Sequence, residues 1–212
     1  GRKVYSQCDE DGIIEEIFNR IGTTDKTFIE IGCGQGLENN THYLLLKGWK
    51  GVWIDGSNEN IRFIKNQLGY RGDKNKKLSI TQTYVDRDNI NQILKENLVQ
   101  IAHEGNTVDF LSMDIDGNDL EVLRHINAVN PRVICVEYNA KFPPSLCETI
   151  NYDPAHRWQG DDYQGSSLAA IHLVMESHGY TLVSCSIAGT NAFFVRNEDI
   201  GPINILPLEK LY

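Results

Sequence analysis

Apolar and polar residues follow two alternating periods along this chain, and the alternation predicts its secondary structure. Short apolar runs are typical of buried strands, whereas apolar residues that recur every three or four positions are typical of amphipathic helices. The runs predict strands at 26–32, 50–56, 78–86, 108–116 and 131–139, and a closing antiparallel hairpin at 180–197. The helical pattern predicts helices at 9–22, 38–47, 58–69, 89–101, 118–126 and 166–179.

Nearly apolar strands that alternate with helices are typical of a parallel sheet covered on both faces. A chain of 212 residues has the length of one domain. We therefore expect a single α/β domain over 1–212, with a Rossmann-like, doubly wound and mostly parallel sheet and a C-terminal antiparallel hairpin. Ligands of such sheets bind at the carboxyl ends of the strands. The predicted strands end close to acidic residues: Glu30, Asp55, Asp86, Asp114 with Asp116, and Glu137 with the neighbouring Asn139.

The first strand runs into a glycine-rich turn, "FIEIGCGQGLENN" at 28–40. Glycines at alternate positions let a ligand touch backbone N–H groups at a helix N-terminus. Asp55, at the end of the second strand, is spaced to bind the hydroxyls of a ribose. Glu30 would repel the pyrophosphate of a dinucleotide but suits the ammonium and sulfonium groups of S-adenosylmethionine. The pattern favours the methyl donor over a nicotinamide cofactor, with a turn that serves only packing as the third alternative.

Asp86 follows the third predicted strand, in "VDRDNI". In this architecture a carboxylate there would accept a hydrogen bond from the exocyclic amine of adenine. An equally good interpretation is that Asp86 caps the helix that begins near Asn89. One residue can serve both purposes, so both readings stay open.

Composition narrows the possible classes of partner. The net charge of −9 is unlike that of proteins that bind nucleic-acid backbones. We interpret the one basic tract, 71–77, as a solvated turn, and no apolar run is long enough to span a membrane. The five scattered cysteines form no CxxC motif and favour reduced thiols and a cytoplasmic location. No secretory signal opens the chain, but it begins at Gly1 and not at Met, so a longer parent protein stays open.

Taken together, the motifs resemble the class I S-adenosylmethionine-dependent methyltransferases, and among them the FkbM-like group. The resemblance is carried by "YSQCDEDGIIEEIF", "FIEIGCGQG", "GVWIDGS", "FLSMDIDGNDLEVL", "PRVICVEYNAKFPP" and "TNAFFVRNE". It implies methyl transfer to oxygen, often to a sugar hydroxyl of a polysaccharide, glycolipid or natural product. The acceptor, the methylated position and the oligomeric state do not follow from the sequence.

The same resemblance implies a set of donor-binding residues. The methionine part of S-adenosylmethionine would lie against Glu30, Gly32 and Gly34, the ribose against Asp55, and the adenine near Asp86. The remaining residues expected at the donor are Ser6, Gln7, Gly56, Ser57 and Asp114. Many chains of this group have Asp-x-Glu-Gly after strand four, whereas this chain has Asp114-Ile115-Asp116-Gly117. The shorter Asp116 keeps the charge and loses reach, which leaves its role open.

Methyl transfer needs an aligned acceptor oxygen and a group that takes its proton. Asp114, Asp116 and Glu137 offer hard oxygen ligands, and one prediction is therefore a Mg²⁺ or Mn²⁺ site. Alternatively, Asp114 contacts the donor or acceptor directly and Asp116 caps the next helix. For a general base the candidates are Asp114 itself, His172 in the helix at 166–179, and His156.

The segment 140–165 is too long to be a simple connection. Its aromatic residues Tyr152, Trp158 and Tyr163 predict a lid that binds the acceptor, which is expected to be a small molecule or a glycan. A lid packed only on itself is the alternative. Two rivals to the whole interpretation stay open: a nicotinamide-dependent reductase, and a non-catalytic donor-binding module of a larger assembly.

Overall fold

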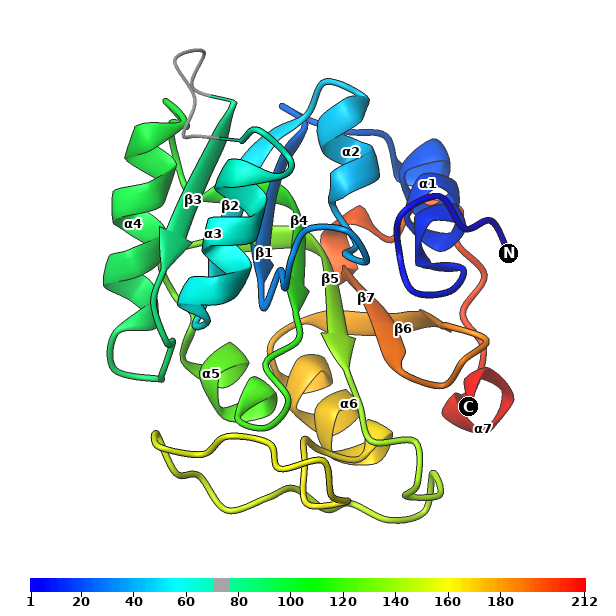
Figure 1. Ribbon diagram of the computed structural model, residues 1–212. Coiled ribbons are helices and arrows are strands. Elements are labelled where there is room, and N and C mark those ends of the chain that lie inside the picture. The colour runs from blue at the N-terminus through cyan, green and yellow to red at the C-terminus, as the bar shows by residue number, and fades with distance from the viewer. Residues whose placement is uncertain (71–76) are drawn as a thin grey trace.

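The structure, a computed structural model, describes residues 1–70 and 77–212. Except for Lys77, the predicted basic turn lies outside these residues. A seven-stranded sheet forms the centre, in the order β3-β2-β1-β4-β5-β7-β6 (Figure 1). The strands are β1 (Thr27–Ile31), β2 (Lys50–Asp55), β3 (Leu78–Gln82), β4 (Thr107–Met113), β5 (Asn130–Glu137), β6 (Tyr180–Cys185) and β7 (Asn191–Arg196).

The first five strands pair in parallel, whereas β7 is antiparallel to both β5 and β6. The predicted doubly wound sheet with a C-terminal antiparallel hairpin is therefore confirmed. The helices are α1 (Glu10–Ile21), α2 (His42–Leu46), α3 (Asn58–Asn66), α4 (Ile90–Gln100), α5 (Asp119–His125), α6 (Leu168–Ser177) and α7 (Leu208–Leu211), with a 3₁₀ turn η1 at Asn197–Asp199. None of those helices is long and apolar enough to cross a membrane.

Each face of the sheet has its own apolar core. The side chains of α4, α5 and α6 pack on one face, and those of α1, α2 and α3 pack on the other. Neighbouring strand residues point to opposite faces, so Ile29 joins the first core and Phe28 joins the second. Glu30 has the same parity as Phe28, so its side chain points to the face that α1 and α2 cover.

Most elements are shorter than predicted, and two of the differences concern the site. β3 ends at Gln82, and residues 83–86 form a loop. α2 begins at His42 and not at residue 38, because the backbone N–H of Asn40 donates to a carboxylate oxygen of Glu30 at 2.7 Å. The glycine turn is therefore separated from the N-terminus of α2.

The segment 140–165 contains no helix or named strand. An isolated bridge between Thr149 and Ser166 closes its end. In Figure 1 this yellow segment lies at the bottom of the view, below α5 and α6, on the side to which the arrows of β4 and β5 point. It is therefore placed at the carboxyl ends of the parallel strands.

Candidate active site

A cavity of about 1040 Å³ lies at the carboxyl ends of the parallel strands. This is the edge at which sheets of this type bind their ligands. Its lining comes from the glycine turn, from the loops after β2, β3 and β4, from the end of β5, and from the segment 140–165. The predicted site residues that line it are Gln7, Gly32, Gly34, Asp55, Gly56, Ser57, Asp114, Asp116, Glu137 and His156.

The glycine turn is held by hydrogen bonds within the protein. The N–H of Gly32 donates to the carbonyl of Ile54 at 2.8 Å, and the N–H of Gly34 donates to Asp55 Oδ2 at 2.8 Å. Both glycines have positive φ angles, 85° and 54°. The expectation that the N–H groups of Gly32 and Gly34 are free for a ligand is wrong, since both donate to residues of β2. Because Gly32 and Gly34 have no side chains, the turn leaves space in the cavity beside its backbone.

Glu30 is buried and does not line the cavity. Its carboxylate accepts hydrogen bonds from the Asn40 N–H and from the Thr41 hydroxyl. Burial raises the pKa of this carboxyl to about 7, although both hydrogen bonds work in the opposite direction. In this structure Glu30 holds the chain between the glycine turn and α2, and a direct contact with a donor stays a prediction.

Asp55 connects the glycine turn to the start of α3. Besides the N–H of Gly34, its carboxylate accepts hydrogen bonds from the Ser57 N–H at 2.8 Å and from Asn60 Nδ2 at 3.1 Å. The Ser57 side chain caps α3 by accepting from the Asn60 N–H at 3.3 Å. Asp55 is thereby oriented at the cavity wall, where the sequence placed it.

Gly56 lies under an aromatic ring of the β3 loop. A Cβ atom at residue 56 would lie 2.3 Å from Cδ1 of Tyr84. Tyr84 lines the cavity and keeps 52% of its surface exposed. Nothing in the sequence singled out this residue, because its position depends on the close approach of the loops after β2 and β3.

Asp86 holds the turn that leads into α4, whose N-cap residue is Asn89. Its Oδ1 accepts hydrogen bonds from the backbone N–H groups of Asp88 at 2.9 Å and of Asn89 at 2.8 Å, just before α4. It does not line the cavity, which Thr83, Tyr84 and Val85 of the same loop do. A contact of Asp86 with adenine stays a prediction.

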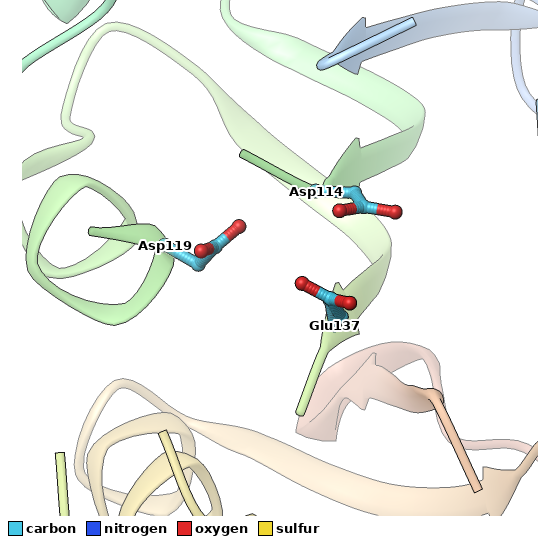
Figure 2. Close-up of side chains that lie close together, drawn as sticks. All are labelled: Asp114, Asp119 and Glu137. Atoms are coloured by element: carbon cyan, nitrogen blue, oxygen red, sulfur yellow. The ribbon is translucent and has the colours of Figure 1, made fainter. Parts of the chain in front are cut away.

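Three carboxylates converge at the ends of β4 and β5 (Figure 2). Asp114, Asp119 and Glu137 each have an oxygen within 4.8 Å of the others. The register explains this, since Ser112 pairs with Cys135, and Asp114 and Glu137 each follow two residues later on the same face. Burial raises the pKa of Asp114, and the charges of Asp119 and Asp116 raise it further, whereas a hydrogen bond with Glu137 lowers it. Burial also raises the pKa of Glu137, and repulsion from Asp114 adds to that effect.

The third member of this acid cluster differs from the predicted metal ligands. Asp119 takes the place that we expected for Asp116. Its two oxygens accept hydrogen bonds from the N–H groups of Ile115 at 2.7 Å and Gly117 at 2.8 Å. Asp116 has a left-handed backbone, with φ of 56°, and is not part of the cluster. The left-handed turn at Asp116 explains why α5 and not the strand end supplies the third carboxylate.

The structure distinguishes between the two histidine candidates for the general base, because only His156 lines the cavity. His156 lines the cavity and packs against Gly117, where a Cβ would lie 2.3 Å from its Cδ2. Its Nε2 is buried and has no hydrogen-bond partner among the described residues. His172 in α6 is half-buried and does not line the cavity. A role of His172 as base stays a prediction, and His156 is the histidine that the fold brings to the site.

The segment 140–165 contacts the loops after β3 and β4. Asn118 Nδ2 donates to the Asp153 carbonyl at 2.7 Å, and the guanidinium of Arg157 lies 3.7 Å from the ring centroid of Tyr84. Of the three aromatic residues of the predicted lid, only Trp158 lines the cavity. The segment therefore covers part of the cavity, but Tyr152 and Tyr163 are directed elsewhere.

Asn139 and Ser6 have structural partners in place of the predicted site contacts. Asn139 Nδ2 donates to the carbonyls of Asp162 at 3.3 Å and Gln164 at 3.2 Å, which ties the segment 140–165 to the end of β5. Ser6 is buried and donates to Asp11 Oδ2. Neither residue lines the cavity.

Several cavity residues were not predicted from the sequence, among them Tyr84, Arg157 and Thr190. Asp119 was also missed as a member of the acid cluster, although an acid in the first turn of the helix after β4 is a signal for it. A Tyr-x-x-x-Lys spacing, as used by some nicotinamide-dependent reductases, occurs at Tyr43 and Lys47 and again at Tyr70 and Lys74, of which Lys74 lies outside the described residues. Tyr43, Lys47 and Tyr70 do not line this cavity, so no such pair lines it among the described residues.

Comparison with known proteins identifies the family. The model of the methyltransferase FkbM domain matches residues 7–182. No protein among the curated sequences matches the chain. The magnesium protoporphyrin IX methyltransferase from Synechocystis PCC 6803, with bound SAH, is 12% identical, with a TM-score of 0.55 over 88% of this chain and 81% of that one.

Two further solved structures have the same fold. The methyltransferase domain of bacterial CtHen1-C is 16% identical, with a TM-score of 0.54 over 89% of this chain and 97% of that one. The O-methyltransferase from Bacillus cereus, in complex with SAH, is 13% identical, with a TM-score of 0.52 over 87% and 78%. At these identities the likeness concerns the fold, whereas the family match covers most of the chain. The chain belongs to the FkbM methyltransferase domain family, and it is an S-adenosylmethionine-dependent methyltransferase.

Proposed function

We propose that the protein transfers the methyl group of S-adenosylmethionine to a hydroxyl oxygen of a carbohydrate, in a polysaccharide, a glycolipid or a small natural product. One observation carries the proposal: a single cavity joins the glycine turn and Asp55 to Asp114 and Glu137, two members of the acid cluster. Methyl transfer is an in-line displacement, so donor and acceptor must meet in one space.

The donor half of the cavity fits an adenosine with a short charged chain. The glycine turn leaves room for the methionine part, and Asp55 offers carboxylate oxygens to the ribose hydroxyls. Tyr84 offers a half-exposed ring to the adenine. Two of the fold neighbours hold SAH, the donor without its methyl group, which supports this assignment. Gln7, Gly56 and Ser57 complete the donor half.

The acceptor half is polar and has one exposed aromatic ring. Trp158 keeps 46% of its surface exposed, and Thr190, Asp114 and Glu137 line the same cavity. An aromatic face surrounded by hydrogen-bonding groups suits a ring with several hydroxyls. This combination is the support for a carbohydrate acceptor.

We assign to Asp114 the role of general base, which removes the proton from the acceptor hydroxyl. A general base works best when its pKa lies near the operating pH, and burial together with neighbouring acids raises the pKa of Asp114. His156 is the second candidate, because its unpartnered Nε2 lies at the lid side of the cavity. In either case the group would accept the proton while the methyl carbon leaves the sulfonium.

The acid cluster also fits a divalent cation. Three carboxylates that repel one another offer the hard oxygen ligands that Mg²⁺ and Mn²⁺ prefer. Asp114, Asp119 and Glu137 would hold the ion, although Asp119 already accepts two backbone hydrogen bonds. When bound, such an ion lowers the pKa of a coordinated hydroxyl and orients it.

Release of SAH from S-adenosylmethionine, measured against a panel of sugars and glycans, tests the proposal. We expect turnover with at least one acceptor, a loss of about 100-fold or more in kcat for Asp114→Asn, and no change for the exposed lid variant Asp162→Asn. A chelator that abolishes turnover, restored by Mg²⁺ or Mn²⁺, would support the metal. Turnover that neither Asp114→Asn nor the chelator reduces would contradict this chemistry, and binding of NADH in place of the methyl donor would contradict the donor.

The cellular setting is part of the proposal. All five cysteines are free, and free thiols are typical of the reducing cytoplasm. The net charge of −9 disfavours a nucleic-acid acceptor. A cytoplasmic enzyme that acts on a small molecule or glycan agrees with both observations.

A further inference from the structure

A second cavity lies between α1 and α2. Its volume is about 420 Å³, within the range of small-molecule sites. Four buried apolar side chains form much of its wall: Ile14, Phe18, Leu44 and Trp49. Its lining shares no residue with that of the donor cavity. It is therefore a separate space, and methyl transfer does not explain it.

Asp11 lines this second cavity with a carboxylate that is only half satisfied. The residue is 2% exposed. Its Oδ2 accepts hydrogen bonds from the N–H groups of Val4 at 2.7 Å, Tyr5 at 2.7 Å and Ser6 at 2.9 Å, and from the Ser6 hydroxyl at 3.0 Å. Its Oδ1 is buried and has no partner among the described residues. A buried carboxylate oxygen without a donor is costly, so it favours a ligand that supplies one.

Buried hydrogen bonds of Asp109 and Arg132 fix one wall of the second cavity. Asp109 accepts hydrogen bonds from the N–H groups of Thr24 and Lys26, and Arg132 bonds both to Asp109 at 2.8 Å and to the Gly22 carbonyl at 2.9 Å. These contacts fix the loop 22–26, which forms one wall. A pre-formed wall lowers the entropy cost of binding.

The charged residues that line the second cavity are two acids, Asp11 and Glu15, and two lysines, Lys26 and Lys47. Glu15 pairs with Lys47, and Arg2 also bonds to Glu15 at 2.8 Å. Lys26 is the remaining charged lining residue besides Asp11. Asp11 is thus the buried charge that a ligand would meet among the apolar side chains.

We propose that this cavity binds a small organic ammonium ion, with the ammonium group donating to Asp11 Oδ1 and an aromatic or branched hydrocarbon body packed between Phe18, Leu44 and Trp49. Trp49 and Phe18 already form an edge-to-face pair, with centroids 5.1 Å apart, which leaves aromatic surface for such a body. The site goes beyond methyl transfer and needs neither the donor nor the acceptor.

The test uses 2-phenylethylamine, which is a cation at neutral pH, and 3-phenylpropanoate as an anion of similar shape. The indole N–H signals of Trp49 and Trp158, assigned with Trp→Phe variants and followed by NMR, report on the second cavity and the donor cavity separately. We expect the amine to shift the Trp49 signal with a Kd on the order of 1 mM, and the anion to leave it unchanged. No shift at ~10 mM amine, equal shifts with both probes, or a shift of Trp158 alone would overturn the proposal.

Asp11→Asn is the sharpest variant. Its amide oxygen can accept the hydrogen bonds from residues 4–6, while its NH₂ group replaces the unpartnered Oδ1 and turns an acceptor into a donor. We expect at least ~10-fold weaker binding of the amine, and unchanged affinity would overturn the proposal.

If near-UV circular dichroism shows that Asp11→Asn does not fold, the variant Leu44→Trp tests the proposed site instead. It fills the cavity, so the Trp49 signal should no longer respond to the amine, whereas the affinity for SAH should stay within about twofold of wild type. A Trp49 response that persists with the cavity filled would overturn the proposal.

Discussion

A Cβ atom at position 32 would lie 1.5 Å from the carbonyl oxygen of Asp114. Gly32 thus lets the end of β1 touch the chain that leaves β4, where the N–H of Asp114 donates to the carbonyl of Ile31 at 3.0 Å. This contact brings the glycine turn and Asp114 into one cavity. The glycine is needed here for the fold as much as for the donor.

Gly32→Ala should destabilise the protein strongly. The added methyl group meets backbone that cannot move aside, and the φ of 85° adds strain. We expect a loss of about 3 kcal/mol or more in the free energy of unfolding, measured with urea. Gly105→Ala is the matched control, since its φ is 83° and a Cβ there meets nothing within 4 Å. It should lose only about 1 kcal/mol, and equal losses in the two variants would contradict the clash.

Asp55→Asn should weaken donor binding more than it weakens the fold. The amide replaces one of the two oxygens that hold Gly34 and Ser57, and it removes the charge that would accept the ribose hydroxyls. We expect SAH to bind about 10-fold to 100-fold more weakly in calorimetric titration. Asp88→Asn, an exposed acid near the same edge, should bind SAH like wild type. Unchanged affinity in Asp55→Asn would remove Asp55 from the donor site.

The buried Glu30 should make stability depend on pH. Its pKa is raised from 4.5 to about 7 because the carboxyl is buried. The folded state therefore favours the protonated form, so its contribution to stability is full below pH 4.5 and is lost as the pH rises through about 7. Glu30→Gln cannot ionise and should avoid this loss.

Urea unfolding of Glu30→Gln and wild type at several pH values measures the effect. We expect the free energy of unfolding of the variant, relative to wild type, to rise with pH by on the order of 3 kcal/mol. The exposed Glu104→Gln should show no such trend. A difference between Glu30→Gln and wild type that stays constant from pH 4 to pH 8 (about these limits) would mean that Glu30 is not buried in this way.

Asp119→Asn should disturb the loop after β4. Each oxygen of Asp119 accepts one backbone N–H, and an amide can satisfy only one of them. We expect a loss of about 1–3 kcal/mol in stability together with reduced methyl transfer, because the loop begins at Asp114. The exposed Asp162→Asn should change neither quantity. Full stability and activity in Asp119→Asn would show that the loop holds without it.

Gly117→Ala should displace the lid. A Cβ at residue 117 would lie 2.3 Å from the imidazole of His156, and the backbone there needs no left-handed φ. We expect little change in the melting temperature, faster proteolysis within 140–165, and lower kcat/KM. In a His156→Ala background the same glycine change should have no further effect, since the clash is gone. Additive effects of the two changes would contradict the contact.

The order of the elements and the sheet type follow from local pattern alone. Runs such as 26–32 and 50–56 are apolar on both faces, and only a sheet with helices on both sides buries such strands. The positions of Asp55 and Asp114 at strand ends follow from the same reasoning, since a parallel sheet presents its carboxyl ends at one edge. The glycine turn and the family motifs needed no knowledge of distant contacts.

The hydrogen-bond partners of the site residues depended on contacts between segments that are far apart in the sequence. The alternation of side chains along β1 directs Glu30 toward Asn40 and Thr41. The residue that we expected to contact the donor therefore accepts hydrogen bonds from these two residues inside the protein. The left-handed backbone at Asp116 moved the third carboxylate of the cluster to Asp119. Local periodicity determines which residues are buried and in which element, because it acts within a few positions. Packing between elements far apart in sequence determines which polar atoms meet, and that is why the lid's His156 and not His172 reached the cavity.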